Sequence, residues 1–481
     1  MSRYEPVVGL EVHAELLTSA KMFCGCRVVD SVTAEPNSAV CPICLGMPGM
    51  LPVANRRAVT FAIRVALALN CEIQRHNIFA RKNYFYPDLP KGYQISQYEL
   101  PLARHGWLNF SLDSGEMRRV GIRRVHMEED TGKLTHVERL GTLVDYNRSG
   151  VPLLEIVTEP DLHAPEEVYA CAQRLRQILR YLEVNSGDLE KGVLRVEPNI
   201  SVRPAGSSEL GTRTEVKNLN SFRALAAATA YEVARQSEIV DEGGSVEQET
   251  RGWSEARRET FPQRRKEEAD DYRYFPEPDL PPLEVDAAWI EAVRAKLPEL
   301  PGARVQRYIS DFGLSPYDSA VLTEERATAE WFEAAVAAGG EPGTIANWIG
   351  NEIFALLNQS RQTIEEIQVT PVALVELIDL IEDGTLSHSA AREVLGEMFA
   401  TGEAPLTLVR EKGLAQISDE AALAGIIAQV LDENPEQVET FLGGKEGLRG
   451  WFVGQVMRAT RGKANPQVVQ ELLARELDGR R

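Results

Sequence analysis

The spacing of apolar residues changes once along this chain of 481 residues, and that change limits the folds the chain can adopt. Before about residue 290, strand-like runs such as Val7–Leu16, Val151–Val157 and Leu194–Val202 alternate with loops and helices. After about Ala287 the strand patterns end and helical spacing takes over. We therefore expect an α+β protein. Its N-terminal α/β domain contains an antiparallel or mixed sheet and is followed by an all-α helical domain and an α-helical tail.

Helix-breaking residues divide the second half of the chain further. Pro298-Glu299-Leu300-Pro301 interrupts one helical pattern, and Glu382–Ser387 is typical of a helix stop followed by a new N-cap. Ala404-Pro405 begins another helical region that continues to the C-terminus. The sequence thus predicts three domains, at residues 1–290, 291–405 and 406–481.

Composition excludes several classes of protein. No run of 18 or more apolar residues is present, and charges and a proline occupy the N-terminus, where a signal peptide needs an apolar core. We therefore expect a cytoplasmic protein with no membrane association. The net charge of −20 argues against a surface that is basic throughout, as in many non-specific nucleic-acid binders, but allows a local basic patch.

Four of the six cysteines form two short pairs. Cys24-Gly25-Cys26 and Cys41-Pro42-Ile43-Cys44 are separated by 14 residues. Disulfides are rare in reducing compartments, and paired cysteines at such spacings are typical of a closed, tetrahedral, structural zinc site. The alternative is four unligated thiols. Cys171 lies on the apolar stripe of a helix that begins at Pro165, and, like Cys71, it is expected to be structural.

The strand Val7–Leu16 places acidic and histidine side chains on one face. Residues two apart in a strand share a face, so Glu11, His13 and Glu15 lie opposite an apolar face. A glutamate and a histidine side by side can both ligate a divalent cation. The alternative is the solvated polar face of an edge strand.

Two later segments favour the metal site. Glu155 is the one carboxylate in the otherwise apolar run Val151–Val157, and a buried, unpaired carboxylate is costly. In the strand before Asp130, Glu129 shares a face with apolar residues, whereas Glu128 lies with Arg124 and His126. Three isolated acids and one histidine suit Mg²⁺ or a similar hard ion.

Two further segments are open to two interpretations. Leu194–Arg203 alternates without a break, which is typical of an ordinary half-buried strand or of a functional polar wall that includes Arg195. Arg81–Pro87, followed by Lys91-Gly92-Tyr93, combines cations with aromatic rings. That combination suits a nucleotide or an RNA end, and equally a packed loop with a cationic rim.

Several common catalytic motifs are absent. The sequence has no P-loop, no Rossmann G-x-G-x-x-G, no G-x-S-x-G elbow and no Ser-Ser-Lys amidase segment. No cysteine stands in an obvious glutaminase context. If the reaction uses ammonia, a partner must release it.

Taken together, these segments resemble one family, the B subunits of the tRNA-dependent amidotransferase that converts mischarged Glu-tRNA(Gln) or Asp-tRNA(Asn) to the amide. The match spans about 280 residues in the expected order and continues more diffusely through Gly454–Met457 and Lys463–Pro466. Its stretches are Val8–His13, Arg81–Pro87, Tyr93–Gln97, His126–Lys133, Asp145–Asp161, Gly211–Phe222 and Asp270–Asp279. One departure is Glu197, which stands where the family usually carries Asp.

The resemblance implies a cradle-like α/β domain, a helical domain and a tail that contacts tRNA. It implies that ATP phosphorylates the side-chain carboxylate of the glutamate or aspartate esterified to tRNA(Gln) or tRNA(Asn), and that ammonia then displaces phosphate. It also implies two partner subunits. One is an amidase, the glutaminase of the assembly, which hydrolyses glutamine and sends the ammonia through a channel, and the other is a small subunit that joins the amidase to this chain. The mischarging aminoacyl-tRNA synthetase is a further candidate partner.

The resemblance also gives roles to the residues found above. The predicted Mg²⁺ ligands are Glu11, His13, Glu129 and Glu155, with Glu128 as the reserve for Glu129. The predicted phosphate or ATP contacts and pocket residues are Arg81, Lys82, Asn83, Tyr84 and Lys91, with Arg148, Arg195, Lys217 and Asn218 as weaker candidates. Lys82 could alternatively pair with a channel carboxylate.

The tail contains a cluster of basic residues within 19 positions that could meet tRNA phosphates, the alternative being a solvated helical face. They are Lys445, Arg449, Arg458, Arg461 and Lys463.

Two competing functions remain at this point. A non-catalytic RNA-binding scaffold with a zinc knuckle would need no acid cluster, and Glu155 in an apolar strand argues against it. A metallohydrolase with the same ligands would turn over without ATP. The sequence does not distinguish Glu-tRNA(Gln) from Asp-tRNA(Asn) as the substrate.

Overall fold

The computed structural model describes residues 3–137, 141–265, 272–417, 419–460 and 463–480. The chain divides into two compact units, Met1–Arg304 and Val305–Arg481, each of which is considered by itself.

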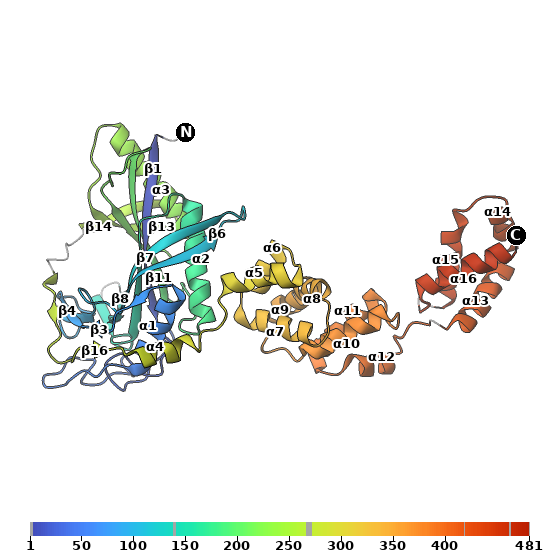
Figure 1. Ribbon diagram of the computed structural model, residues 1–481, viewed down its shortest axis with the longest axis horizontal. Coiled ribbons are helices and arrows are strands. Elements are labelled where there is room, and N and C mark those ends of the chain that lie inside the picture. Colours follow the sequence, from blue (N-terminus) through green and yellow to red (C-terminus); the bar gives the residue numbers. More distant parts are fainter. Residues whose placement is uncertain (1–2, 138–140, 266–271, 418, 461–462, 481) are drawn as a thin grey trace. The chain divides into compact units, whose positions relative to one another are not determined.

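A nine-stranded sheet is the framework of the first unit (Figure 1). Its strands are β1 (Tyr4–Glu15), β2 (Glu72–Ile73), β6 (Ala103–Ser111), β7 (Met117–Glu129), β10 (Pro152–Thr158), β11 (Leu194–Pro204), β12 (Thr214–Lys217), β13 (Glu249–Ser254) and β14 (Glu259–Arg265). They lie in the order β14-β13-β12-β11-β1-β10-β7-β6-β2. Only the β12–β13 pair is parallel among these neighbours, so the sheet is mixed and the predicted α+β fold is confirmed.

Three small sheets accompany the large one. They are formed by β4 (Ala80–Asn83), β5 (Tyr93–Ser96) and β15 (Phe275–Pro276), by β3 (His76–Asn77) and β16 (Leu283–Glu284), and by β8 (Lys133–Val137) and β9 (Gly141–Asp145). Strand β5 packs on the end of β7, because the Gln94 side chain donates to the Glu129 carbonyl over 2.7 Å. The basic, aromatic segment of β4 therefore lies beside the central strands.

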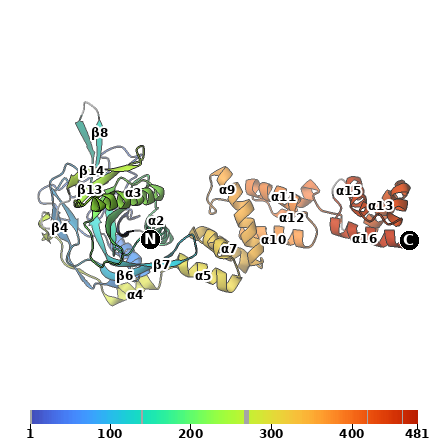
Figure 2. The ribbon, with the colours of Figure 1, turned by 90° about the horizontal axis from the view of Figure 1, so that it is seen from above.

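Helices cover the apolar face of the sheet (Figure 2). They are α1 (Arg56–Ala68), α2 (Pro165–Tyr181) and α3 (Phe222–Asp241), and α4 (Ala287–Arg294) packs on α1. Pro165 begins α2, and the predicted stripe that includes Cys171 is buried. Because Leu10 and Val12 lie in the same core as these helices, Glu11 and His13 point to the opposite face. Val293 of α4 belongs to this core as well, and the unit accordingly extends beyond residue 290 to Arg304.

The described part of the second unit is helical. Its helices are α5 (Pro301–Phe312), which begins within the first unit, α6 (Pro316–Leu322), α7 (Arg326–Ala337), α8 (Pro342–Trp348), the π-helix η2 (Ile349–Ile353), α9 (Phe354–Ser360), α10 (Pro371–Glu382), α11 (His388–Thr401), α12 (Pro405–Lys412), α13 (Glu420–Glu433), α14 (Pro435–Leu442), α15 (Leu448–Ala459) and α16 (Pro466–Gly479). Two separate apolar cores hold them, one at 308–409 and one at 423–477. None of the helices in the described ranges has the length and hydropathy of a membrane span.

Candidate active site and metal centres

The four paired cysteines converge. All four sulfur atoms lie within 4.8 Å of one another, and the Cys41 and Cys44 sulfurs are 3.9 Å apart. Four thiolates at ~2.3 Å from one zinc ion would be ~3.8 Å apart in a tetrahedron, so the cluster has the donor set and the size of a structural zinc site. Cys71 and Cys171 are buried in the apolar core, as predicted.

A fully buried lysine lies against this cysteine cluster. The Lys21 ammonium is 3.7 Å from the Cys44 sulfur and 3.2 Å from the Tyr146 carbonyl oxygen, and Lys21 is 0% exposed. No described carboxylate comes within 4.0 Å of it. A hydrogen bond from the Cys24 thiol and the positive charge of Lys21 lower the pKa of Cys44 to about 4. A buried ammonium needs a negative partner, and the Cys44 sulfur is the nearest group in the described residues that can supply one.

The predicted acid and histidine residues of β1 and β10 lie in one row across the sheet. Arg195 of β11 is opposite His13 of β1, His13 is opposite Glu155 of β10, and Glu155 is opposite His126 of β7. Residues paired in this way have Cβ atoms about 4.5–5.5 Å apart, so their side chains interact directly. Sequence alternation predicted the faces correctly, and the strand order brings them together.

Carboxylate oxygens surround His13 at similar distances. Its Nε2 atom is 3.7 Å from Glu11, 3.6 Å from Glu128 and 3.5 Å from Glu155. One ligand atom each from Glu11, His13 and Glu155 lies within 4.8 Å of the others, and the same holds for His126, Glu128 and Glu155. This arrangement of oxygen and imidazole donors suits a divalent cation.

A second acidic group shares Glu11. Glu197 of β11 is opposite Glu11, and Glu215 of β12 completes a set whose oxygens also lie within 4.8 Å of one another. Lys217 is 2.8 Å from Glu197 and 3.6 Å from Glu215. The Glu197 carboxylate, which departs from the residue expected from the resemblance, reaches this set. The sequence patterns did not single out Glu215, although its alternation with Lys217 in a short strand was a usable signal.

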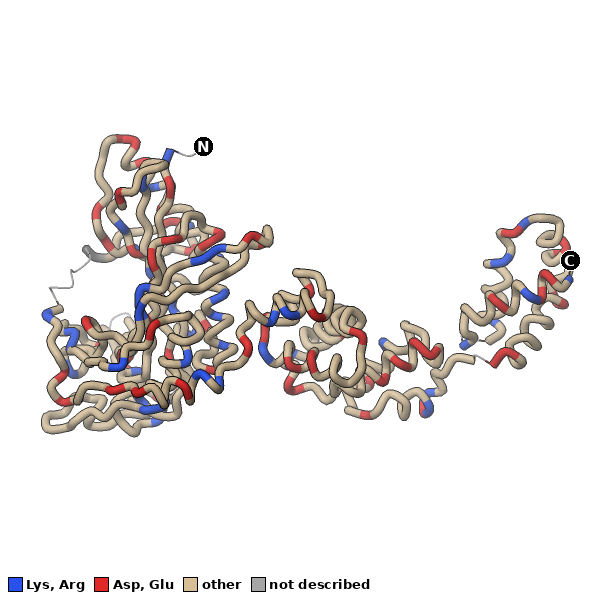
Figure 3. Tube along the Cα trace, in the orientation of Figure 1, with Lys and Arg blue, Asp and Glu red and all other residues tan. Residues whose placement is uncertain are grey.

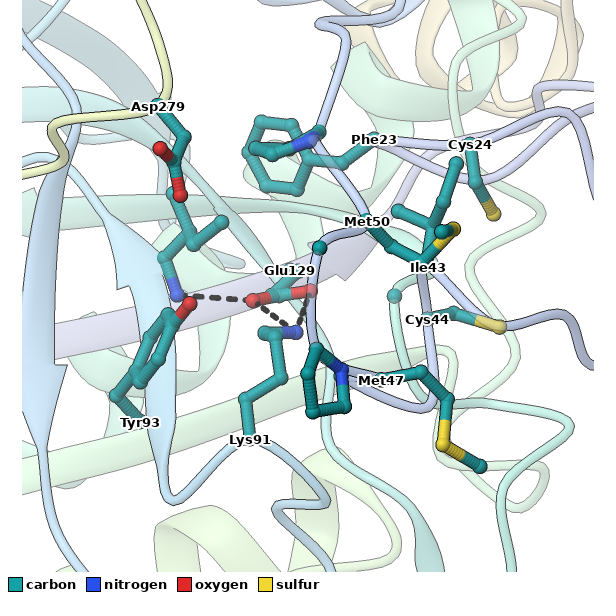
Figure 4. A pocket seen from close by; sticks show the side chains of 16 residues that line it. Phe23, Cys24, Ile43, Cys44, Met47, Met50, Lys91, Tyr93, Glu129 and Asp279 are labelled. Atoms are coloured by element: carbon teal, nitrogen blue, oxygen red, sulfur yellow. Dashed lines mark hydrogen bonds and ion pairs between the residues drawn. The ribbon is translucent and has the colours of Figure 1, made fainter.

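Glu129 is the predicted ligand that the structure does not bring to the cluster. Its carboxylate is 2.8 Å from the Lys91 ammonium (Figure 4). It also accepts the Ile95 backbone N–H over 2.9 Å, and it lies on the opposite face of β7 from Glu128. Glu128, the alternative ligand predicted from the sequence, lies beside His13 instead. The physical reason is alternation along the strand, since the apolar neighbours of Glu129 belong to the core face.

The protonation of the cluster reflects its excess of negative charge. Burial opposes protonation of His13, but the nearby carboxylates of Glu155, Glu11 and Glu128 raise the pKa of His13 to about 9. Burial and the charge of Glu155 raise the pKa of Glu11 to about 7. Burial opposes ionisation of Glu155, but His126 and His13 hold its pKa well below the usual range. A cation bound here would replace the protons.

A cavity of about 210 Å³ lies over these groups and is lined by three cations, Lys82, Arg195 and Lys217. The Lys82 ammonium lies 4.9 Å from the centre of the Tyr272 ring. Tyr84 also lines the cavity, and its ring packs edge-on against Tyr272. Burial raises the pKa of Tyr84 above its usual value. The cavity therefore combines acidic ligand groups with positive charge and aromatic rings.

Four of the other predicted phosphate or pocket residues have structural partners. Arg81 makes two 2.7 Å hydrogen bonds to Glu277, and Lys91 pairs with Glu129. Arg148 donates to two backbone carbonyls, and the Asn83 side chain donates to the carbonyls of Tyr272 and Arg273. Asn218 is exposed and has a left-handed backbone at φ 64°.

Arg195 contacts a pair of acidic residues, Asp130 and Glu15. Asp130 accepts a 2.7 Å hydrogen bond from Arg195 and is hydrogen-bonded to Glu15 of β1. Burial and the charge of Asp130 raise the pKa of Glu15 to about 8. Burial opposes ionisation of Asp130, but the charges of Arg195 and Arg148 lower its pKa to about 2. At neutral pH the pair thus holds one proton, on Glu15.

Glu15→Gln is expected to change the pH dependence of stability. The folded-state pKa of Glu15 is raised above its unfolded value, so the stability it contributes is present at low pH and is lost as pH rises from about 4.5 to 8. Gln keeps the donor and cannot ionise. The variant should therefore gain free energy of unfolding relative to the wild type steadily across this range, as measured by urea denaturation at pH 5, 7 and 9. A constant difference would show that Glu15 does not titrate in this window.

Four basic residues of the tail are exposed in the second unit. Lys445 lies between α14 and α15, Arg449 and Arg458 lie on α15, and Lys463 precedes α16. Acidic and basic positions are interspersed along these helices (Figure 3). Arg461 lies outside the described residues. The tRNA contact of this cluster stays a prediction.

Residues 6–291 match the family described as the GatB/GatE catalytic domain, and residues 330–477 match the GatB domain. The chain belongs to the GatB family. It is 52% identical over 471 residues to the B subunit of the aspartyl/glutamyl-tRNA(Asn/Gln) amidotransferase from Thermodesulfovibrio yellowstonii, with 98% of each chain covered. Proteins with the same name from Moorella thermoacetica and Brevibacillus brevis are 53% and 51% identical over 477 and 479 residues, covering 98% and 99% of this chain and 100% of each relative.

Proposed function

We propose that this chain acts as the B subunit of a tRNA-dependent amidotransferase. It uses ATP to phosphorylate the side-chain carboxylate of Glu-tRNA(Gln), Asp-tRNA(Asn) or both, and ammonia from a glutaminase partner then completes Gln-tRNA(Gln) or Asn-tRNA(Asn). The observation that carries the proposal is that two acidic ligand groups adjoin one cavity, which their members Glu11, His13, Glu128 and Glu197 line together with three cations. Membership of the GatB family supports it.

The side chains of the cavity suit this chemistry. A carboxylate is a poor electrophile, and phosphorylation turns one of its oxygens into a leaving group. Bound Mg²⁺ would neutralise the charge of the transferred phosphate. Glu11, His13, Glu128 and Glu155 would hold one cation, and Glu11, Glu197 and Glu215 a second. Lys82, Arg195 and Lys217 present positive charge to the phosphates from the cavity wall.

Other parts of the chain suit a cytoplasmic assembly with partners. The sequence has no amidase or glutaminase motif, so a separate amidase would supply ammonia and a small third protein would join that amidase to this chain. The exposed basic residues of the tail would meet tRNA phosphates. The four cysteines would hold one structural zinc ion. The mischarging synthetase is a further candidate partner.

The function is tested with the chain assembled with its partner subunits. We expect ATP hydrolysis that requires both mischarged tRNA and Mg²⁺ and that releases one phosphate for each amide formed. Hydrolysis of substrate without nucleotide would favour a metallohydrolase. Tight tRNA binding without any ATP turnover would favour an RNA-binding scaffold. Correctly charged Gln-tRNA(Gln) is the matched control and should elicit no turnover.

A further inference from the structure

His126 is a buried histidine beside the proposed cation ligands. It is 2% exposed, and its Nε2 atom lies 3.0 Å from a Glu155 oxygen. Its Nδ1 atom is buried and has no hydrogen-bond partner among the described residues. Neither the sequence patterns nor the proposed function gives this side chain a role.

The two ring nitrogens of His126 indicate its tautomer. A proton on Nε2 is donated to the Glu155 oxygen 3.0 Å away, whereas a proton on Nδ1 would find no acceptor among the described residues. The Nε2 atom is thereby used as a donor and has no lone pair for a metal ion.

The Nε2 atom of His13 has different surroundings from the Nε2 atom of His126. Its Nε2 atom is 3.5–3.7 Å from three carboxylates, which is longer than a good N–H···O bond, and it faces the cavity. His126 contacts Glu155 at hydrogen-bond length from the neighbouring strand. Of the two histidines, His13 has the environment of a ligand and His126 that of a support.

We propose that His126 is a positioning residue, which donates Nε2–H to Glu155 and fixes the orientation of that carboxylate as a cation ligand. This inference rests on the proposed function. Hydrogen bonds to a ligating carboxylate orient it and set its affinity for the ion. The second acidic group, at Glu197 and Glu215, lies outside this effect because Glu155 is not part of it.

The test compares His126→Gln, His126→Asn and His126→Ala. The terminal nitrogen of Gln can occupy the place of Nε2, whereas the shorter Asn amide corresponds to Nδ1 and does not reach Glu155. Mn²⁺ affinity is measured on the full chain from the EPR signal of the free ion, without tRNA or ATP. Glu155→Ala identifies the Mn²⁺ bound at this site. We expect Asn and Ala to weaken binding about 10–100-fold and Gln to retain most of the affinity.

Every outcome bears on the inference. Equal affinities of wild type and His126→Ala, with binding lost in Glu155→Ala, would overturn the positioning role and leave the cation site intact. Loss in His126→Gln as complete as in Glu155→Ala would make His126 a direct ligand instead. If Glu155→Ala itself binds Mn²⁺ like the wild type, the proposed cation site fails, and this inference fails with it. Thermal unfolding of His126→Gln checks that the chain is folded.

Discussion

Glu128→Gln is expected to lower tRNA- and Mg²⁺-dependent ATP hydrolysis by about 100-fold or more, because a cation at this site supplies several kcal/mol of charge stabilisation. The Glu128 oxygen is 3.6 Å from His13 in a cluster that already carries excess negative charge. Because the charge of Glu128 also stabilises protonated His13 and the Lys82 ammonium, the free energy of unfolding should fall as well, by about 1–3 kcal/mol. ATP hydrolysis in the assembled enzyme and urea denaturation of the chain measure the two effects separately.

Its neighbour Glu129 is the matched control. Glu129→Gln leaves the partly buried Lys91 ammonium without its negative partner, which should cost up to about 3–5 kcal/mol of stability. Its Mn²⁺ affinity should equal that of the wild type. Replacing the pair together, as Glu129→Gln with Lys91→Met, should restore much of the lost stability because no unpaired charge remains. The opposite pattern, with Mn²⁺ binding lost in Glu129→Gln and kept in Glu128→Gln, would return Glu129 to the ligand set.

The comparison of these two glutamates shows what the sequence could predict. Alternation placed Glu11 and His13 on one face, and the apolar strand around Glu155 identified a buried acid that needs a partner. For Glu129 the same reasoning failed, because an apolar setting also marks the core face of a strand. Its partner Lys91 is 38 positions away in the chain. Strand alternation cannot show a contact over that separation.

The basic candidates show the same limit. Arg81 combines with aromatic neighbours in a pattern that suits phosphate binding, yet its guanidinium is taken by Glu277, 196 positions away. Lys82, one residue later, points into the cavity. Arg81 and Lys82 are both positively charged, and both lie close to aromatic residues in the sequence. Only the pairing of β4 with β15 decides which cation is available.

The second large effect is expected at the four-cysteine site, where one substitution should abolish zinc binding. Cys44→Ser should reduce the zinc content from about one ion per chain to near zero, because a closed four-thiolate site contributes about 10–16 kcal/mol of apparent binding energy that a hydroxyl does not replace. Loss of zinc should also lower the thermal midpoint of the first unit. Metal analysis after aerobic, chelator-free purification measures the content. A zinc content near zero in the wild type would show that this cluster does not hold zinc.

Lys21, the buried lysine beside the cysteines, allows a second test of the zinc site. A zinc ion with four thiolates carries two net negative charges, and Lys21 is the buried cation that offsets part of them, 3.7 Å from Cys44. Lys21→Met should therefore speed zinc release to a chromogenic chelator by about tenfold, because removal of a partner from the surroundings of a metal site typically weakens it by 10–100-fold. Lys191→Met is the matched control, because Lys191 is exposed and pairs with Asp30, not with a cysteine. Equal release rates in both variants would mean that the buried ammonium does not hold the ion. Faster release in Lys21→Met alone would explain why a lysine is buried there without a carboxylate.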